Sequence, residues 1–150
     1  MEQSEQWGAC LDSGIAPENS LLNVGEQTIS LGKSPDDQTY GWDNEYGQSK
    51  VKVASFDTST YLVSNAEYMA FVEAGGYKND SHWNEEGRAW LSYTKAEMPR
   101  FWQLIDGEYY QRNLLSLIPL PMSWPVEVNY LEAKAFCHWK SEQTNSFIRL

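Results

Sequence analysis

The stretch Trp124–Lys140 constrains the fold of this chain more than any other, because a strand pattern passes directly into a helix pattern there. Pro125 suits the first position of a strand, since it cannot donate to a ladder. Val126 and Val128 alternate with a polar residue, as in a half-buried strand. Asn129 ends this alternation. The stretch therefore predicts a short strand that leads into a buried helix.

The helix is expected to begin after Asn129, whose side chain can accept hydrogen bonds from the first unpaired backbone N–H groups. Glu132 can reach back to the Asn129 amide in a variant of the capping box. The apolar stripe is expected on Ala133, Phe136, Cys137 and Lys140, widened by Leu131 and Ala135. This strand–helix unit is the part of the chain best suited to start a core.

The composition suits one acidic domain rich in aromatic residues. The 150 residues include 11 basic and 21 acidic side chains, and the net charge of -10 argues against nonspecific binding to nucleic acid or to an anionic membrane. Seven Trp and nine Tyr suit a core of large rings or a groove for a small ligand. We find no secretory signal and no long apolar run, so we expect no membrane span and a cytoplasmic location.

Strand patterns dominate the first part of the chain. Residues 1–20 are polar and are expected to be a linker. Residues 21–31 predict a strand whose halves turn a hairpin at Gly25–Glu26. Two further strands are expected at residues 51–56 and 60–63, where apolar and polar residues alternate or β-branched and aromatic residues gather.

Helix and turn signals follow. Ser64–Glu67 is a capping box that opens a helix, and Gly75–Gly76 is expected to end it in a left-handed stop. Asn84 can cap a second helix. Asp106–Gly107 predicts a hairpin between two strands. Residues 114–122 are apolar and rich in proline, so we expect an irregular buried crossing there.

The segment Tyr40–Gly47 places side-chain oxygens beside aromatic rings. One interpretation is a ligand-facing or cation-facing loop, with Trp42, Asp43 and Asn44 as the candidate substrate-binding residues. The other is an aromatic plug whose Asp and Asn cap local backbone amides. The second is favoured because loops that cap their own backbone are common.

No catalytic or metal-binding residues are predicted from spacing. His82 and His138 form neither a His-x3-His pair nor a His-Glu-x-x-His motif, so an iron or zinc site within this chain is not expected. Cys10 and Cys137 lie far apart; a free buried thiol is the preferred interpretation of Cys137, and a disulfide stays open. Neither a Gly-x-Ser-x-Gly elbow nor a phosphate-binding loop is present.

Several segments, taken in order, resemble one family. They are Ile29–Gly32, Tyr61–Tyr68 with Phe71, and Pro125–Ala133 with Arg149–Leu150. Together they resemble the domain shared by formylglycine-generating enzymes and sulfoxide synthases, over about residues 20–150. The resemblance implies an α+β fold of the formylglycine-generating-enzyme-like (C-type-lectin-like) kind. Short antiparallel strands, two or three helices and much loop are expected.

Within this family, three segments are most similar to the histidylcysteine sulfoxide synthase of ovothiol biosynthesis. They are Asn129–Tyr130, where the family often has Ser-Trp, together with Tyr40–Gly47 and Glu132–Lys140. That resemblance implies oxygen-dependent joining of cysteine to histidine or a histidine derivative, with sulfoxidation. A hercynine oxygenase or formylglycine-generating enzyme relative is the first alternative. A lectin-like module that binds a small ligand without catalysis is the second.

The resemblance also implies where the cofactor is held. In the family, a separate helical-bundle domain carries the His ligands of a nonheme Fe(II), so no cofactor is expected on this chain. The family continues beyond Arg149–Leu150 with a second half that supplies most of the pocket. Residues 21–150 are therefore expected to be the N-terminal half of the domain, incomplete and inactive alone, and no catalytic residue is assigned.

Overall fold

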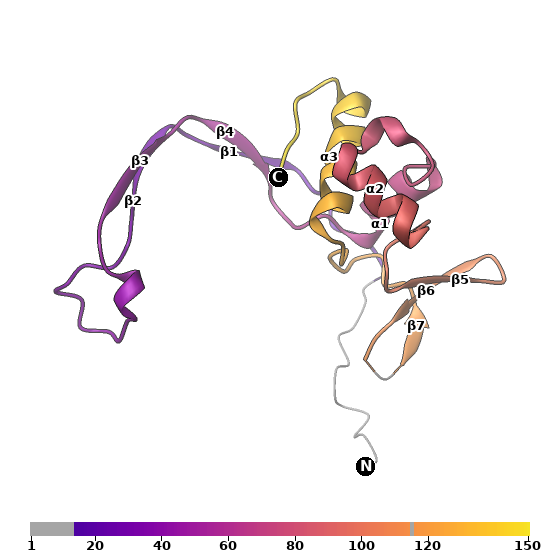
Figure 1. Cartoon of the computed structure of the whole chain (residues 1–150), viewed down its shortest axis with the longest axis horizontal. Helices are drawn as coiled ribbons and strands as arrows, with labels where there is room; N and C mark the ends of the chain where they lie inside the picture. Colours follow the sequence, from indigo (N-terminus) through magenta and orange to yellow (C-terminus); the bar gives the residue numbers. More distant parts are fainter. Residues whose placement is uncertain (1–13, 115) are drawn as a thin grey trace, which may run out of the picture. The chain divides into compact units, whose positions relative to one another are not determined.

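The computed structural model describes residues 14–114 and 116–150, which form short antiparallel strands, three α-helices and long loops (Figure 1). They fall into two compact units, Asn19–Tyr61 and a larger unit made mainly of Leu62–Leu150. The expected α+β class is confirmed. None of the described helices is both long and apolar enough to cross a lipid bilayer. The linker expected at residues 1–20 lies mostly outside the described residues.

The smaller unit, Asn19–Tyr61, is built from two antiparallel strand pairs. Strand β1 (Leu21–Val24) pairs with β4 (Phe56–Ser59), and β2 (Gln27–Leu31) pairs with β3 (Ser49–Val53). The chain reverses in the loop between β2 and β3. The two pairs follow one another as one long ribbon (Figure 1).

The hairpin predicted at Gly25–Glu26 is wrong. Val24 pairs with Phe56 and Gln27 pairs with Val53, so β1 and β2 face the same returning chain and do not face each other. The dipeptide interrupts the ladder without reversing the chain. A local turn signal is insufficient here because the later strands offer a longer partner for both halves.

The strand predicted at residues 60–63 is also absent. The β1–β4 ladder ends at Ser59, and the following residues form no ladder. Asn19 and Tyr61 close this end of the ribbon instead. The Asn19 side chain donates to the Tyr61 carbonyl at 3.2 Å and accepts from the Tyr61 N–H at 3.0 Å.

Three capped helices form the centre of the larger unit: α1 (Asn65–Glu73), α2 (Glu85–Thr94) and α3 (Tyr130–Thr144). The predicted caps are confirmed: Ser64 accepts from the Glu67 N–H, Asn84 from Gly87, and Asn129 from Leu131 and Glu132. Each cap satisfies backbone N–H groups that a helix leaves unpaired at its start. Local sequence therefore decides where all three helices begin.

Aromatic residues build the core of this unit. Its buried members are Tyr68, Phe71, Tyr77, Trp83, Trp102, Leu120, Ala135, Phe136 and Trp139. Tyr68 of α1 stacks on Phe136 of α3 with ring centroids 5.2 Å apart, and Phe71 meets Phe136 edge-on at 6.0 Å. Such offset and edge-to-face pairs add stability beyond the area that they bury. The core of large rings that the composition suggested is thus formed between α1 and α3.

The buried face of α3 is offset from the predicted stripe. The buried residues are Glu132, Ala135, Phe136 and Trp139, at helical spacing. The predicted Ala133, Cys137 and Lys140 are only half-buried. The prediction placed a charged glutamate outside the stripe, whereas the structure buries Glu132 among hydrogen-bond donors.

The strand expected before α3 is absent as well. Pro125 forms a single bridge with Ser64, and the Val126 N–H donates to the Val63 carbonyl at 2.9 Å. Ser64 is the N-cap of α1, so the segment that faces Pro125 enters a helix at the next residue and cannot extend the pairing. The alternating pattern was present, but no partner of sufficient length was available.

A small sheet completes the unit. Strands β5 (Trp102–Ile105), β6 (Glu108–Arg112) and β7 (Leu117–Pro119) are antiparallel in that order. Asp106 and Gly107, with φ of 51° and 85°, make the predicted two-residue turn.

The irregular buried crossing predicted over residues 114–122 is wrong in its first part. Leu117–Pro119 pairs with β6 as a regular strand, and Leu114 is 95% exposed. Among the described residues of this segment, only Leu120 and Pro121 are buried. Pro119 is tolerated because β7 is an edge strand, where a missing N–H breaks no inner ladder.

Candidate functional site

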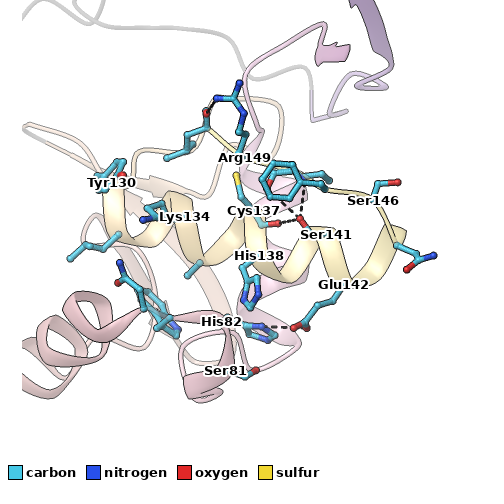
Figure 2. Close-up of a pocket in the computed structure, with 18 residues that line it drawn as sticks. Ser81, His82, Tyr130, Lys134, Cys137, His138, Ser141, Glu142, Ser146 and Arg149 are labelled. Carbon is cyan, nitrogen blue, oxygen red and sulfur yellow. Dashed lines mark hydrogen bonds and ion pairs between the residues drawn. The ribbon is translucent and has the colours of Figure 1, made fainter. Parts of the chain in front are cut away.

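A hollow of about 850 Å³ lies along α3 in the larger unit, and Figure 2 shows the residues around it. Its walls come from residues 81–84, from one face of α3 and from residues 145–150. Ser141 of α3 holds residues 145–150 in place. Its hydroxyl accepts from the Ile148 N–H at 2.9 Å and lies 2.8 Å from the Cys137 carbonyl, to which it donates. The hollow is thus held open by contacts between α3 and the segment that follows it.

Two histidines and a glutamate meet at one part of this hollow (Figure 2). His82 ends the short 3-10 helix η2 (Asp80–His82), and His138 and Glu142 lie one turn apart on α3. The two imidazole centroids are 6.2 Å apart, and His82 Nδ1 lies 3.5 Å from a Glu142 carboxylate oxygen. One ligand atom from each residue lies within 4.8 Å of the other two. Two imidazoles and a carboxylate are donors that suit a transition-metal ion.

His82 is the buried member of the three, at 7% exposure. Asn79 Oδ1 accepts from the Ser81 N–H at 3.1 Å, so the Asn79 amide nitrogen faces the ring and donates to His82 Nε2 at 3.1 Å. The proton of the neutral imidazole therefore lies on Nδ1, which has no hydrogen-bond partner among the described residues. Burial lowers the pKa of His82; Glu142 opposes this effect and His138 adds to it.

Cys137 lies on the wall of the same hollow as a half-buried free thiol. Burial raises its pKa. The thiol is therefore the form present at neutral pH, and an activated nucleophile, which needs a thiolate, is not formed here. The prediction of a free buried thiol is confirmed for the free thiol but not for its burial, because Cys137 is half-buried; Cys10 lies outside the described residues.

A buried carboxylate occupies the other end of α3. Glu132 is 3% exposed and accepts from the Tyr77 hydroxyl at 2.6 Å and from the Asn129 N–H at 2.8 Å. No basic side chain of the described residues pairs with it. Burial raises its pKa, and the bonds from Tyr77 and Asn129 limit the rise. Glu132 also lines a second hollow of about 640 Å³, together with Trp90 and Trp102.

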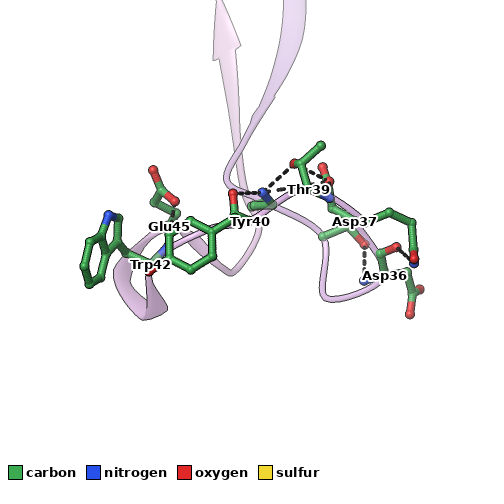
Figure 3. Close-up of polar contacts among 9 residues, drawn as sticks. Asp36, Asp37, Thr39, Tyr40, Trp42 and Glu45 are labelled. Atoms are coloured by element: carbon green, nitrogen blue, oxygen red, sulfur yellow. Dashed lines mark hydrogen bonds and ion pairs between the residues drawn. The ribbon is translucent and has the colours of Figure 1, made fainter.

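The predicted substrate-binding residues Trp42, Asp43 and Asn44 lie in the smaller unit, in the loop between β2 and β3 (Figure 3). The loop contains the 3-10 helix η1 (Asp43–Glu45) and caps its own backbone. A Glu45 carboxylate oxygen accepts from the Trp42 N–H at 2.7 Å, and Asp43 Oδ1 accepts from the Asn44 N–H at 3.0 Å. These contacts agree with the self-capping interpretation of the acidic side chains.

The aromatic rings of this loop are on the surface and do not form a buried plug. Tyr40 is 78% exposed and Trp42 is 66% exposed, and their rings meet edge-to-face at 5.6 Å. Lys33 ties the loop together, because its Nζ donates to the Tyr40 carbonyl and to the Thr39 hydroxyl, each at 2.6 Å; Figure 3 shows Thr39 and Tyr40. A loop with several internal hydrogen bonds thus presents two exposed rings that a ligand can reach.

Sequence spacing alone missed the approach of His82 to His138 and Glu142. The local part of the signal was present as His138-x3-Glu142, which puts an imidazole and a carboxylate on one helix face. His82 joins them only through tertiary packing, because its ring is held against Phe71 at 6.1 Å between centroids. No spacing rule could supply that contact.

Comparison with known proteins places the chain in a family. Residues 14–150 match the sulfatase-modifying factor enzyme 1-like domain. The chain belongs to this family. It is 33% identical over 110 residues to the hercynine oxygenase of Mycolicibacterium thermoresistibile, covering 73% of this chain and 24% of that protein. The resemblance seen in the sequence is therefore confirmed at the level of the family.

Two further relatives in the family carry related names. Ergothioneine biosynthesis protein 1 of Schizosaccharomyces pombe is 30% identical over 111 residues, covering 72% of this chain and 12% of that protein. The hercynine oxygenase of Mycobacterium tuberculosis is 30% identical over 112 residues, covering 73% and 25%. The matched part of the chain thus spans a quarter or less of the length of these relatives.

Proposed function

We propose that this chain contributes the substrate-pocket domain of a sulfoxide synthase of the hercynine oxygenase type. The observation that carries the proposal is its 33% identity to a hercynine oxygenase over 73% of the chain. A second hercynine oxygenase at 30% identity supports the same branch. The proposed reaction uses oxygen to join the sulfur of a cysteine to a histidine derivative.

The proposal assigns the Fe(II) of this reaction to a separate domain, as the family resemblance implies. When bound, that ion supplies the oxygen chemistry. Among the described residues, His82, His138 and Glu142 have the donor types of a nonheme iron site. However, the Asn79 contact keeps a proton on His82 Nδ1, the atom that faces Glu142. Any metal ion at His82 would need that proton to move to Nε2, and no catalytic step is assigned to these residues.

We assign substrate contact to Trp42, Asp43 and Asn44. Hercynine, the substrate named for the bacterial relatives, is a histidine betaine with a quaternary ammonium group. Such cations bind to the faces of aromatic rings. The exposed rings of Tyr40 and Trp42 supply a surface of that kind, and Asp43, which follows Trp42 in the sequence, adds a negative charge to the loop. The loop therefore suits the cationic end of this substrate.

A synthase of the ovothiol type is the second candidate. It is favoured by Asn129–Tyr130, the dipeptide that departs from the Ser-Trp common in the family. Tyr130 is 63% exposed and lies on the wall of the hollow along α3, where a ligand can reach it. The two candidates differ in their substrate, which is hercynine for the first and histidine for the second. A lectin-like module would bind either ligand without any reaction.

Calorimetric titration of the whole chain with hercynine and with histidine separates these candidates. We expect hercynine to bind about two- to fivefold more tightly than histidine, and Trp42→Ala to remove most of that preference, since a cation–π contact at an exposed ring is worth about 0.5–1 kcal/mol. Tyr93→Ala, at a side chain that is 90% exposed on α2, is the matched control and should change nothing. Preference for histidine would favour the ovothiol type, and binding of neither ligand would contradict the proposed pocket role.

A further inference from the structure

His82 offers a buried nitrogen that nothing in the described structure satisfies. The ring is 7% exposed, and its Nδ1 has no hydrogen-bond partner within residues 14–114 and 116–150. The nearest opposing group is the Glu142 carboxylate at 3.5 Å, beyond the usual length of an N–H to oxygen hydrogen bond. Native proteins pair almost all such buried polar atoms. An unpaired imidazole nitrogen that faces a carboxylate and a second imidazole points to a missing ligand between them.

We propose that His82, His138 and Glu142 bind a divalent transition-metal ion, with Zn²⁺ as the ion that fits best. Imidazole nitrogens select transition metals over Mg²⁺ and Ca²⁺, which take oxygen ligands. Zn²⁺ exceeds Fe²⁺ in affinity for a given set of ligands. The site rests on these three side chains alone and is independent of the proposed function.

The geometry needs only a small movement to close around the ion. Bonds of about 2.0–2.2 Å to a tetrahedral Zn²⁺ bring ligand atoms to about 3.4 Å from one another. The three ligand atoms lie within 4.8 Å of one another in the structure. His138 and Glu142 are exposed and free to change rotamer, whereas His82 is held by its packing against Phe71. The fourth position would open into the hollow, where water can complete the set.

Asn79 sets how tightly the ion binds. Metal binding through Nδ1 moves the imidazole proton to Nε2, which then needs an acceptor. Asn79 now presents its amide nitrogen to Nε2, so its side chain has to turn over and give up the bond from the Ser81 N–H. An aspartate at this position would accept from Nε2 and from Ser81 together. Asn79→Asp should therefore tighten the site, as carboxylates do behind zinc-bound histidines.

The ion would join two segments that are remote in the sequence. His82 comes from η2, and its two partners come from α3. Binding would therefore fasten the loop after α1 to the last helix and raise the stability of the larger unit. This consequence gives the site a measurable effect that does not depend on any catalytic activity.

The test is titration of the whole metal-free chain with Zn²⁺ by calorimetry, and with Co²⁺ by its visible absorption. We expect one tightly bound ion, a melting temperature that rises with free Zn²⁺, and a tetrahedral Co²⁺ spectrum. His138→Ala and Glu142→Gln should each weaken binding at least about tenfold, and Asn79→Asp should tighten it by about the same factor.

Two variants control for other sites on the chain. Glu97→Gln changes an exposed carboxylate outside the cluster and should leave the affinity unchanged, as should Cys137→Ala. Because His138 and Glu142 are exposed, their variants should fold, which circular dichroism checks. Stoichiometric binding that persists in His138→Ala would overturn the proposal. Absence of binding, or weaker binding by Asn79→Asp, would do the same.

Discussion

Glu132 is a charged residue on the buried face of α3, where the other buried residues are apolar. It occupies a buried position on α3, yet its carboxylate has two strong donors, Tyr77 and Asn129. Tyr77 in turn lies 3.3 Å from the Tyr68 hydroxyl, so the network joins the start of α3 to the core. Burial raises the pKa of Tyr77, which keeps its hydroxyl protonated and able to donate. A buried carboxylate with donors but no cation is tolerated at a cost that depends on pH.

That cost leads to a prediction for Glu132→Gln. Folding raises the pKa of Glu132 above its ordinary value of 4.5, so the folded chain binds this proton more tightly than the unfolded chain. The stabilisation is complete below about pH 4.5 and is lost as the pH rises through the folded pKa. A glutamine stays neutral, can accept from the Asn129 N–H and can donate to Tyr77. We expect the variant to gain stability relative to the wild type as the pH rises from about 4.5 to 7.

Urea unfolding at several pH values measures this difference. Glu67→Gln is the matched control, because Glu67 makes the equivalent capping-box contact at the start of α1. The pH dependence of this control is the reference against which the change in Glu132→Gln is compared. The prediction would be wrong if the free energies of unfolding of Glu132→Gln and the wild type changed in parallel with pH. It would also be wrong if the wild type became more stable relative to the variant as the pH rises.

At the scale of elements, the sequence predicted helix caps and a tight turn correctly but did not predict which strands pair. The caps at Ser64, Asn84 and Asn129 and the turn at Asp106–Gly107 were found, because each depends on a few neighbouring residues. The hairpin at Gly25–Glu26 was wrong, because pairing with distant strands decided it. The Trp42–Asn44 loop was predicted from composition as a candidate site and stays a prediction, whereas the histidine–glutamate cluster needed the packed structure.

The end of α1 gives a prediction at this scale. Gly76 donates to the Phe71 carbonyl at 2.9 Å and Gly75, at φ 78°, donates to Val72 at 3.0 Å, which together form the Schellman motif. A Cβ on Gly76 would overlap the buried ring of Phe71. Gly76→Ala should therefore lower the free energy of unfolding by about 1–3 kcal/mol, as overpacking does.

Chemical denaturation followed by circular dichroism measures this loss. Gly25→Ala is the control, because a Cβ at Gly25 meets nothing within 4 Å. That variant should keep its stability within about 0.5 kcal/mol. Equal stability of Gly76→Ala and Gly25→Ala would show that the Phe71 ring can move aside without loss.

At the scale of the whole molecule, burial divides the chain. Every buried member of the core belongs to the larger unit, and no residue of Asn19–Tyr61 is buried. Apolar side chains of the ribbon, Leu21 among them at 72% exposure, remain open to solvent in that unit. A two-stranded ribbon without a buried face is marginally stable in water. The family match nevertheless includes both units, so the ribbon belongs to the domain as much as the core does.

Hydrogen exchange should therefore separate the two units. We expect the backbone amides of the four ribbon strands, β1 to β4, to exchange fast by local opening. Those of α1 and α3 should exchange slowly, because opening these helices exposes the aromatic core. The β5–β6 hairpin is the matched control: it is also a short antiparallel pair, but its Trp102 is 5% exposed and anchored in the core. Its protection should exceed that of the ribbon. Mass spectrometry of peptides from Leu21–Leu31 and Tyr130–Thr144 measures this difference. Equal protection of the ribbon and α3 would mean that the ribbon gains stability beyond its own two strand pairs.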